Sequence, residues 1–185
     1  VMELVQKLDG ETLIDPENGD RLIDSITRYH TKLYHDALTD SYNRLYFEDE
    51  LKDKTDPAGV VVLDLDDFKL INDTYGHQAG DMALRTCVDV VRASIRKSDV
   101  LIRYGGDEFL LVLPGIEHAA FLAKLDRIRE QLHTASVPGY SRLQLSSSIG
   151  GVITQPGETV EQAVSRADKL MYQAKNRKNM VVTED

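Results

Sequence analysis

The spacing of apolar residues along the chain predicts a helix near its start. After a turn over residues 15–20, apolar side chains recur at intervals of four, three and four residues, at Leu22, Ile26, Tyr29 and Leu33. A stripe at this spacing is typical of an amphipathic helix. Two roles remain open for it, packing on its own domain or pairing as a parallel two-helix connector, because about two heptads are too few to decide.

The rest of the chain alternates between strand-like and helix-like patterns. Residues 58–66 form a continuous apolar run that ends in carboxylates, which predicts a strand covered on both faces. Shorter strands are predicted at 100–103, 109–113, 143–149 and 180–183. Helices are predicted at 43–51, 67–73, 79–96, 117–132 and 160–176. Helices interleaved with strands indicate a layered α/β domain built on one sheet.

Composition narrows the class of protein. The 185 residues are 42% apolar and 29% charged, which suits one ordinary domain with a short appendage. With 22 basic and 31 acidic residues, the net charge is −9. This balance argues against a nucleic-acid binder or an anionic-membrane binder, while a small anionic ligand stays open. No apolar run approaches the roughly 18 residues of a membrane span, so we expect no membrane contact by this segment.

The cysteine content and the first residues bear on localisation. Cys87 is the only cysteine, so an intrachain disulfide and a multi-cysteine metal site are excluded. The first residues lack the charged start and apolar core of a signal peptide. We therefore expect a reducing, cytoplasmic setting. Because the chain opens on Val1, we also expect a longer protein with a sensory domain upstream.

Three carboxylates crowd the end of the predicted central strand. In a strand, Asp64 and Asp66 share one face and Leu65 points to the other. Burying these charges is costly, and a hard cation such as Mg²⁺, which prefers oxygen ligands, would relieve their repulsion. The alternative is a solvated strand end followed by a helix cap at Asp66 or Asp67.

Residues 103–109 read RYGGDEF and predict a hairpin turn with an acidic tip. Gly105 and Gly106 permit a tight turn with positive φ and let the backbone approach a ligand closely. Beside the carboxylates of the central strand, Asp107 and Glu108 would complete a two-carboxylate metal site for nucleotide chemistry. The alternative is a plain hairpin with two solvated acids.

A polar segment over residues 68–81 offers groups that suit guanine, namely Lys69, Asn72, His77 and Asp81. A carboxylate accepts from the N1–H and N2–H₂ donors of guanine, and an Asn amide can bond a mixed edge. Taken singly, His77 could be a structural histidine and Asp81 a helix cap. The chain has no GxxxxGK[ST] phosphate loop, so a triphosphate would be held by metal, scattered Lys and Arg, or helix N-termini.

Taken together, five blocks of sequence resemble the GGDEF domain of the diguanylate cyclase family. The blocks are residues 36–44, 63–81, 103–109, 148–150 and 167–175. The resemblance implies an α/β (α+β) domain of the nucleotidyl-cyclase and polymerase-palm type, in which helices wrap a central five-stranded mixed sheet. It assigns the catalytic domain to residues 36–185 and leaves residues 1–35 as a helical linker or signalling stub.

The activity implied by the resemblance is that of a diguanylate cyclase. In that family two GTP-loaded subunits of a homodimer face each other. Each ribose 3′-OH attacks the α-phosphate of the opposite GTP, so that two pyrophosphates leave and cyclic di-GMP forms. An alternative left open is a catalytically silent domain that binds GTP or cyclic di-GMP and signals by contact.

The family's metal-binding and catalytic roles carry over by position. Asp64 and Asp107 would hold Mg²⁺, with Mn²⁺ as an alternative ion, and the Leu65 carbonyl would add a backbone ligand. Glu108 would be a further metal ligand or would help to deprotonate the 3′-OH.

The substrate-binding positions implied by the family are Lys69, Asn72, Asp81, Gly105, Gly106 and Lys175. Lys69 and Lys175 would contact phosphates. Asn72 and Asp81 would read the guanine edge. An acid at position 81 suits the two donors of guanine better than the mixed edge of adenine, which favours GTP over ATP.

A regulatory site is implied as well. Residues 96–99 fit the RxxD product-inhibition site of the family, at its usual offset from RYGGDEF. Arg96 would bind guanine and phosphate of cyclic di-GMP, and Asp99 would bind a guanine edge.

The chain departs from the family pattern after Lys175. The family usually ends in AKxxGRN, whereas residues 174–179 read AKNRKN. Either the glycine is deleted and Lys178 replaces the arginine, or Lys178 replaces the glycine and Asn179 the arginine. Arg177 could also supply the phosphate contact.

Overall fold

The structure is a computed structural model that describes residues 16–184, with side chains from residue 23 onward. Its internal contacts divide the chain into two units, residues 1–35 and 36–185. Helix α2 (Pro16–Tyr34) belongs to the first unit and covers the predicted amphipathic stripe. On this helix Ile23 and Tyr29 are exposed, and the side chain of Leu22 lies outside the described residues. No helix in the described ranges combines the length and apolarity that a membrane span needs.

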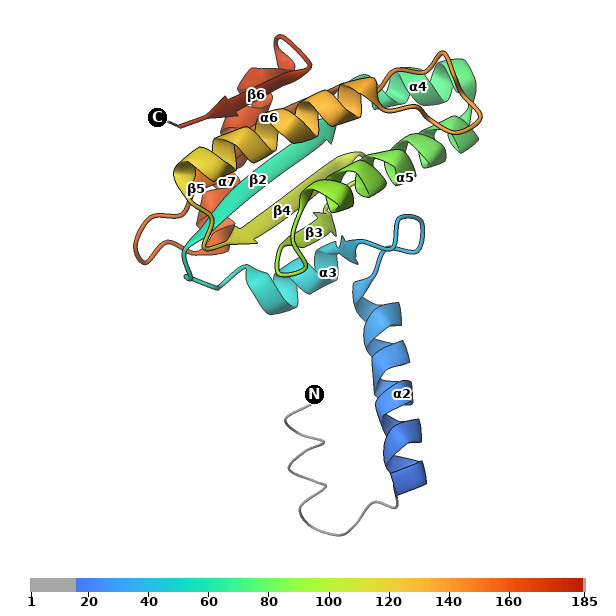
Figure 1. Ribbon diagram of the computed structural model, residues 1–185, viewed down its shortest axis with the longest axis vertical. Coiled ribbons are helices and arrows are strands. Elements are labelled where there is room, and N and C mark those ends of the chain that lie inside the picture. Colours follow the sequence, from blue (N-terminus) through green and yellow to red (C-terminus); the bar gives the residue numbers. More distant parts are fainter. Residues whose placement is uncertain (1–15, 185) are drawn as a thin grey trace. The chain divides into compact units, whose positions relative to one another are not determined.

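The second unit is built on one mixed sheet, with strand order β1-β3-β4-β2-β5-β6 (Figure 1). The strands are β1 (Tyr42–Asn43), β2 (Ala58–Leu65), β3 (Val100–Arg103), β4 (Glu108–Pro114), β5 (Ser147–Ile153) and β6 (Met180–Thr183). The central strand β2 is antiparallel to both β4 and β5, while β1 with β3 and β5 with β6 are parallel pairs. The α/β class with a mixed sheet is confirmed.

Two details of the predicted sheet are wrong. The sheet has six strands rather than five, because Tyr42 and Asn43 pair with β3, and two residues are too short to show an alternating pattern. The fifth strand begins at Ser147 rather than at 143. Leu143 and Leu145 are buried, as their alternation suggested, but they lie in an irregular segment.

Helices cover both faces of the sheet. They are α3 (Arg44–Tyr46), a π-helix (Phe47–Leu51), α4 (Phe68–Tyr75), α5 (His77–Ser94), α6 (His118–Thr134) and α7 (Val160–Lys175). Helices α5 and α6 cross one face (Figure 1) and enclose a core that includes Val61 and Leu63 of β2. Helix α7 and the π-helix enclose a second core that includes Val60 and Val62. Burial on both faces explains the continuous apolar run of β2.

Close packing of α7 on β5 places the C-terminal end of this helix beside the end of β2. A capping box begins the helix, in which Thr159 Oγ1 accepts from Gln162 N and the Gln162 side chain accepts from Thr159 N. At Gly150 of β5, a Cβ atom would lie 2.1 Å from the Ala167 carbonyl oxygen. Only glycine allows this approach, which brings Lys175 at the end of α7 to the end of β2.

Candidate active site

Carboxylates from two strands and a turn meet at the end of β2. Asp64 lies directly opposite Glu108 of β4 in the antiparallel register. The Leu65 amide donates to the Asp107 carbonyl oxygen at 3.2 Å, which ties the glycine turn to β2. The fold therefore brings together Asp64, Leu65, Asp107 and Glu108, although 43 residues (107 − 64) separate the first acid from the turn.

The carboxylate of Asp64 is poorly compensated for its burial. The residue is 5% exposed, its Oδ2 pairs with Lys175 Nζ at 3.0 Å, and its buried Oδ1 has no hydrogen-bond partner. Burial raises the pKa of Asp64 to about 6, against the effect of Lys175, and the charges of Asp107 and Glu108 add to the rise. An oxygen without a donor in such a place is suited to a cation.

The carboxylates around Asp64 suit Mg²⁺ better than a metal that needs three or more side-chain ligands. Within residues 16–184, no three His, Cys, Asp or Glu side chains form a metal-binding group. Mg²⁺ usually takes one or two protein carboxylates and completes its shell with water and substrate phosphates. The buried, unpaired oxygen of Asp64 beside Asp107 fits that pattern.

Glu108 shares this acidic environment. Its pKa is raised by burial first, and then by the charges of Asp168 and Asp107. Asp168 lies on α7 and was not among the predicted site residues. Its sequence signal is its spacing of seven residues, two helical turns, from Lys175, which puts both side chains on one face of the helix.

Lys175 is the cation that faces these acids. Partial burial disfavours its ammonium, but the hydrogen bond to Asp64 and the charges of Asp64 and Asp107 raise its pKa overall. Its side chain is still 42% exposed. A lysine that pairs with a buried carboxylate and also reaches solvent can contact an incoming anion.

The glycine turn is held by an arginine from β3. Arg103 Nη1 pairs with Asp36 Oδ1 at 3.0 Å, and its Nη2 donates to the Gly106 carbonyl oxygen at 2.8 Å. Asp36 also accepts from the backbone and hydroxyl of Thr39. Sequence reasoning missed this link, since nothing local indicates that residues 36 and 103 meet.

The conformation of the two glycines differs from the expectation. Neither Gly105 nor Gly106 has a positive φ. The turn closes instead through the amides of Tyr104 and Gly105, which both donate to the Glu108 carbonyl oxygen. A Cβ atom at Gly106 would meet nothing within 4 Å, so this backbone is open to an approaching ligand.

The predicted guanine-reading residues Asn72 and Asp81 lie on α4 and α5, and Asn72 packs against α5 one residue before Asp81. A Cβ atom on Gly80 would lie 2.0 Å from Asn72 Oδ1, so the Asn72 side chain lies against the residue that precedes Asp81. Lys69 and Asp81 are exposed. Helix α5 begins at His77, which is exposed, so neither a helix cap at Asp81 nor a buried structural histidine describes this segment.

The other two acids at the end of β2 have structural partners. Asp66 accepts from the hydroxyls of Ser146 and Ser148 and from the amide of Asn179. Asp67 takes the N-cap position of α4, but its side chain pairs with Lys178 rather than with a helix amide.

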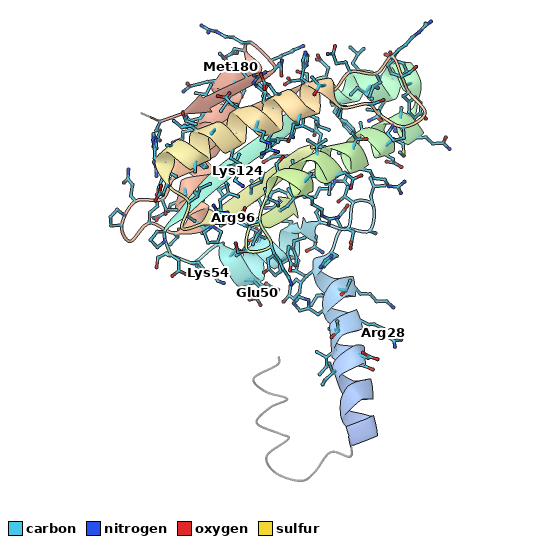
Figure 2. The ribbon with its side chains drawn as sticks, viewed as in Figure 1. Arg28, Glu50, Lys54, Arg96, Lys124 and Met180 are labelled. Atoms are coloured by element: carbon cyan, nitrogen blue, oxygen red, sulfur yellow. The ribbon has the colours of Figure 1, made fainter. Side chains whose placement is uncertain are left out.

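The RxxD residues lie at the opposite end of β3 from the glycine turn. Arg96 is exposed, whereas the Asp99 side chain is only 4% exposed. Asp99 Oδ2 accepts from the Arg96 amide at 2.8 Å and pairs with Lys124 Nζ at 3.6 Å. Figure 2 labels Arg96 and Lys124, the second of which sequence reasoning missed.

Comparison with known sequences gives the family. Residues 33–180 match the family described as "Diguanylate cyclase, GGDEF domain". A protein named "Probable diguanylate cyclase DgcT" from Escherichia coli is 39% identical over 163 residues, which is 82% of this chain and 36% of that protein. "Diguanylate cyclase DgcS" from Shewanella oneidensis is 39% identical over 147 residues, 76% of this chain and 49% of that protein. The chain thus spans less than half the length of these two relatives.

Solved structures agree with this fold. The coiled coil and GGDEF domain of DgcB from Caulobacter crescentus, in complex with c-di-GMP, gives a TM-score of 0.82 at 27% identity and covers 98% of this chain and 99% of that one. Diguanylate cyclase SiaD with its activator SiaC from Pseudomonas aeruginosa gives 0.81 at 28% identity and covers 99% of this chain and 74% of that one.

Proposed function

Because the chain belongs to the GGDEF family of diguanylate cyclases, we propose that it condenses two GTP molecules into cyclic di-GMP with release of two pyrophosphates. The observation that carries this proposal is the buried, unpaired Oδ1 of Asp64 beside the acids of the glycine turn. Buried polar atoms are normally paired, so a charged oxygen without a donor at this place favours a bound cation over a purely structural strand end.

In this proposal Asp64, Asp107 and the Leu65 carbonyl hold Mg²⁺, or Mn²⁺ in its place. The bound ion would neutralise the charge that develops on the α-phosphate and on the leaving pyrophosphate. Glu108 lies next to this position with a raised pKa, which suits a residue that accepts the proton of the 3′-OH.

The substrate residues fit one bound GTP. Asn72 and Asp81 read the guanine edge, and Lys69 and Lys175 contact the phosphates. Gly105 and Gly106 form the turn that would face the nucleotide, and the backbone at Gly106 is open to it. The pairing of Lys175 with Asp64 supports its role, because a metal on Asp64 would release the ammonium for phosphate.

Catalysis requires two such sites to face each other, so we propose a homodimer. Helix α2 would act as a linker that transmits a signal to the catalytic domain, in the cytoplasm, while residues 1–15 of the predicted linker lie outside the described residues. Product inhibition would occur at Arg96 and Asp99. The outward Arg96 supports this, and Asp99 would exchange its contact with Lys124 for guanine.

Substitution of Asp107 by alanine tests the proposal. We expect Asp107→Ala to abolish pyrophosphate release from GTP and Mg²⁺ while leaving thermal unfolding in metal-free buffer nearly unchanged, because it removes one half-exposed charge from a repulsive cluster. Asp56→Ala is the matched control, because Asp56 is an exposed carboxylate two residues before β2 begins. This variant should keep full activity. A large loss of stability in Asp107→Ala would instead indicate a structural role.

A further inference from the structure

A row of side chains crosses the sheet at the end where the acids gather. Strands β1 and β3 are parallel and end in register, so Arg44, the residue after β1, lies beside Tyr104, the residue after β3. The Tyr104 amide donates to the Glu108 carbonyl oxygen at 2.9 Å, and Glu108 lies opposite Asp64 of β2. The row therefore runs from β1 to β2 in the order Arg44, Tyr104, Glu108 and Asp64.

These side chains lie on the face of the sheet that α7 covers. Leu110 of β4 belongs to the core under α7, and Glu108, two residues earlier, points to the same face. Tyr104 packs against this core, and the guanidinium carbon of Arg44 lies 4.7 Å from the centre of the Tyr104 ring. Neighbouring strands are about 5 Å apart, so the backbones of Arg44 and Glu108 are about 10 Å apart. One bound nucleotide can span that distance.

The contacts of Arg44 within the chain are weak. Its side chain is 63% exposed, and its Nε lies 3.4 Å from Glu48 Oε1, in a surface ion pair that water screens strongly. Within the described part of the chain, the other donors of the guanidinium have no hydrogen-bond partner. The Tyr104 ring therefore orients the guanidinium and leaves most of its donors available to a ligand.

Glu108 lies between two cations. Burial and two neighbouring carboxylates raise the pKa of Glu108, whereas the charges of Lys175 and Arg44 lower it. Lys175 pairs with an acid of β2, while Arg44 follows β1, and β4 lies between these two strands in the sheet. Arg44 is thus a second cation, on the side of Glu108 that faces away from Lys175, and the proposed chemistry has not yet given it a role.

Two nucleotides have to meet at Glu108 in the proposed function. The phosphates of the GTP held by this chain lie near Lys69 and Lys175, which follow β2 and contact β2 respectively. The 3′-OH that gives its proton to Glu108 belongs instead to the GTP held by the second copy. That nucleotide approaches from the side that the first nucleotide leaves open, which is the side of Arg44.

On the basis of the proposed function, we propose that Arg44 binds a phosphate of the GTP held by the second copy and so places the 3′-OH of that nucleotide beside Glu108. The planar guanidinium donates two parallel hydrogen bonds to a phosphate, which fixes its orientation. The bond from the 3′-oxygen to the α-phosphorus then forms as the bond to the pyrophosphate oxygen breaks, and the proton passes to Glu108. Arg44 positions the nucleotide and takes no part in this proton transfer.

The first test separates turnover from binding. Arg44→Ala should lower kcat for cyclic di-GMP about tenfold or more, the effect of one charge-assisted contact. The probe for binding is the α,β-methylene analogue of GTP with Mg²⁺, at chain concentrations low enough to keep the chain monomeric. Its affinity should be the same for Arg44→Ala and the unaltered chain, because the contact forms only between two copies.

Two further variants complete this comparison. Arg44→Lys keeps the charge and the stem that lies over Tyr104, so it covers any folding defect of the alanine variant, and it should recover only part of kcat because it lacks the planar fork. Arg142→Ala is the matched control, because Arg142 is an exposed arginine in the segment before β5. It should change neither turnover nor affinity.

A mixing experiment at saturating GTP shows which nucleotide Arg44 binds. In a mixed dimer with one working centre, the nucleotides are joined once and give the linear dinucleotide pppGpG with one pyrophosphate. The unaltered chain should form pppGpG with an excess of Asp107→Ala, and equally with an excess of the double variant Arg44→Ala/Asp107→Ala, because the working centre keeps its own Arg44. Arg44→Ala mixed with an excess of Asp107→Ala should form about tenfold less.

The contrary results are equally specific. If the double variant abolishes pppGpG while Arg44→Ala supports it, Arg44 binds the nucleotide of its own chain and the inference is overturned. A loss of analogue affinity in monomeric Arg44→Ala overturns it too. If Glu48→Gln, which removes only the ion pair, lowers turnover as much as Arg44→Ala, the contact within the chain is what matters and the inference fails.

The same measurements separate this inference from the proposed function. If the folded, unaltered chain binds the GTP analogue but forms neither cyclic di-GMP nor pppGpG from GTP, both are overturned. If it forms cyclic di-GMP and Arg44→Ala forms it equally fast, only the role of Arg44 is lost.

Discussion

At the scale of single residues, Asp64 combines burial with incomplete pairing. One oxygen meets Lys175 and the other meets no donor. Asp107 and Glu108 add repulsion, so the charged form of Asp64 is costly without a cation. Without a metal, the ionised Asp64 carboxylate therefore lowers the stability of the fold, at the position where the proposed chemistry needs a negative charge.

This cost predicts a pH dependence of stability. The Asp64 pKa rises from 3.8 to about 6 on folding, so between these values the folded chain holds a proton that the unfolded chain has lost. Stability should therefore fall as pH rises through this window, by on the order of 1 to 3 kcal/mol. Asp64→Asn should lack this component.

Urea unfolding in EDTA, from pH 4.5 to pH 7.5, measures the difference between the two chains. The gap between the unaltered chain and Asp64→Asn should change across the window, and Mg²⁺ at pH 7.5 should stabilise only the unaltered chain. If the two chains instead show the same pH dependence of unfolding free energy and respond equally to Mg²⁺, the Asp64 carboxylate neither has a raised pKa nor binds the ion.

A second residue-scale prediction concerns Gly80. In Gly80→Ala the new Cβ would overlap Asn72 Oδ1 and push the amide away from the residue before Asp81. We expect affinity for the GTP analogue to fall about tenfold, the worth of roughly one good hydrogen bond. Asn72→Ala should give a similar loss, and the double variant should lose no more. Additive losses in calorimetric titration would argue against the assignment of Asn72.

At the scale of elements, two connections hold the site in shape. The end of α7 and the residues after it are joined to the end of β2 by the Lys175–Asp64 ion pair and by the hydrogen bond from the Asn179 amide to Asp66. Arg103 holds the β3–β4 turn through the Gly106 carbonyl oxygen. Arg103 bridges Asp36 and the carbonyl oxygen of Gly106, the residue before Asp107. The position of Asp107 therefore depends on a residue at the very start of the second unit.

Arg103→Lys tests this bridge. Lysine keeps the charge but lacks the planar fork that binds a carboxylate and a carbonyl together. We expect a loss of about 1 to 3 kcal/mol in unfolding free energy and a clear drop in turnover, because both partners are partly buried. Asp36→Asn should reproduce part of the loss. A lysine variant with unaltered stability and turnover would mean that the turn holds itself.

The sequence predicted features that depend on neighbouring residues and missed those that depend on residues far apart in the chain. The apolar run of β2 and the acids at its end are local signals, and they predicted the central strand. The family resemblance, rather than a local signal, implied that Asp64 and the glycine turn would act together. The bridge from Asp36 to Arg103 and the pair of Lys178 with Asp67 join segments 67 and 111 residues apart, and no local pattern encodes them. The start of β5 was misplaced because Leu143 and Leu145 alternate and are buried like strand residues, although they lie in an irregular segment.

At the scale of the whole molecule, the domain of residues 36–184 gathers acids and lysines at the end of β2, on a scaffold with two cores. The net charge of −9 includes the acids that a divalent cation would neutralise. In the proposed function each such site would hold one nucleotide, so joining two nucleotides would need a second copy of the chain. We therefore expect a reaction between two GTP molecules rather than hydrolysis of one.

The most direct test is mass spectrometry of the products after incubation of the chain with GTP and Mg²⁺. We expect cyclic di-GMP and pyrophosphate in a ratio of one to two, with neither formed by Asp107→Ala. A folded, dimeric sample that binds GTP and yields neither product would contradict the account and would indicate the silent, nucleotide-binding domain instead.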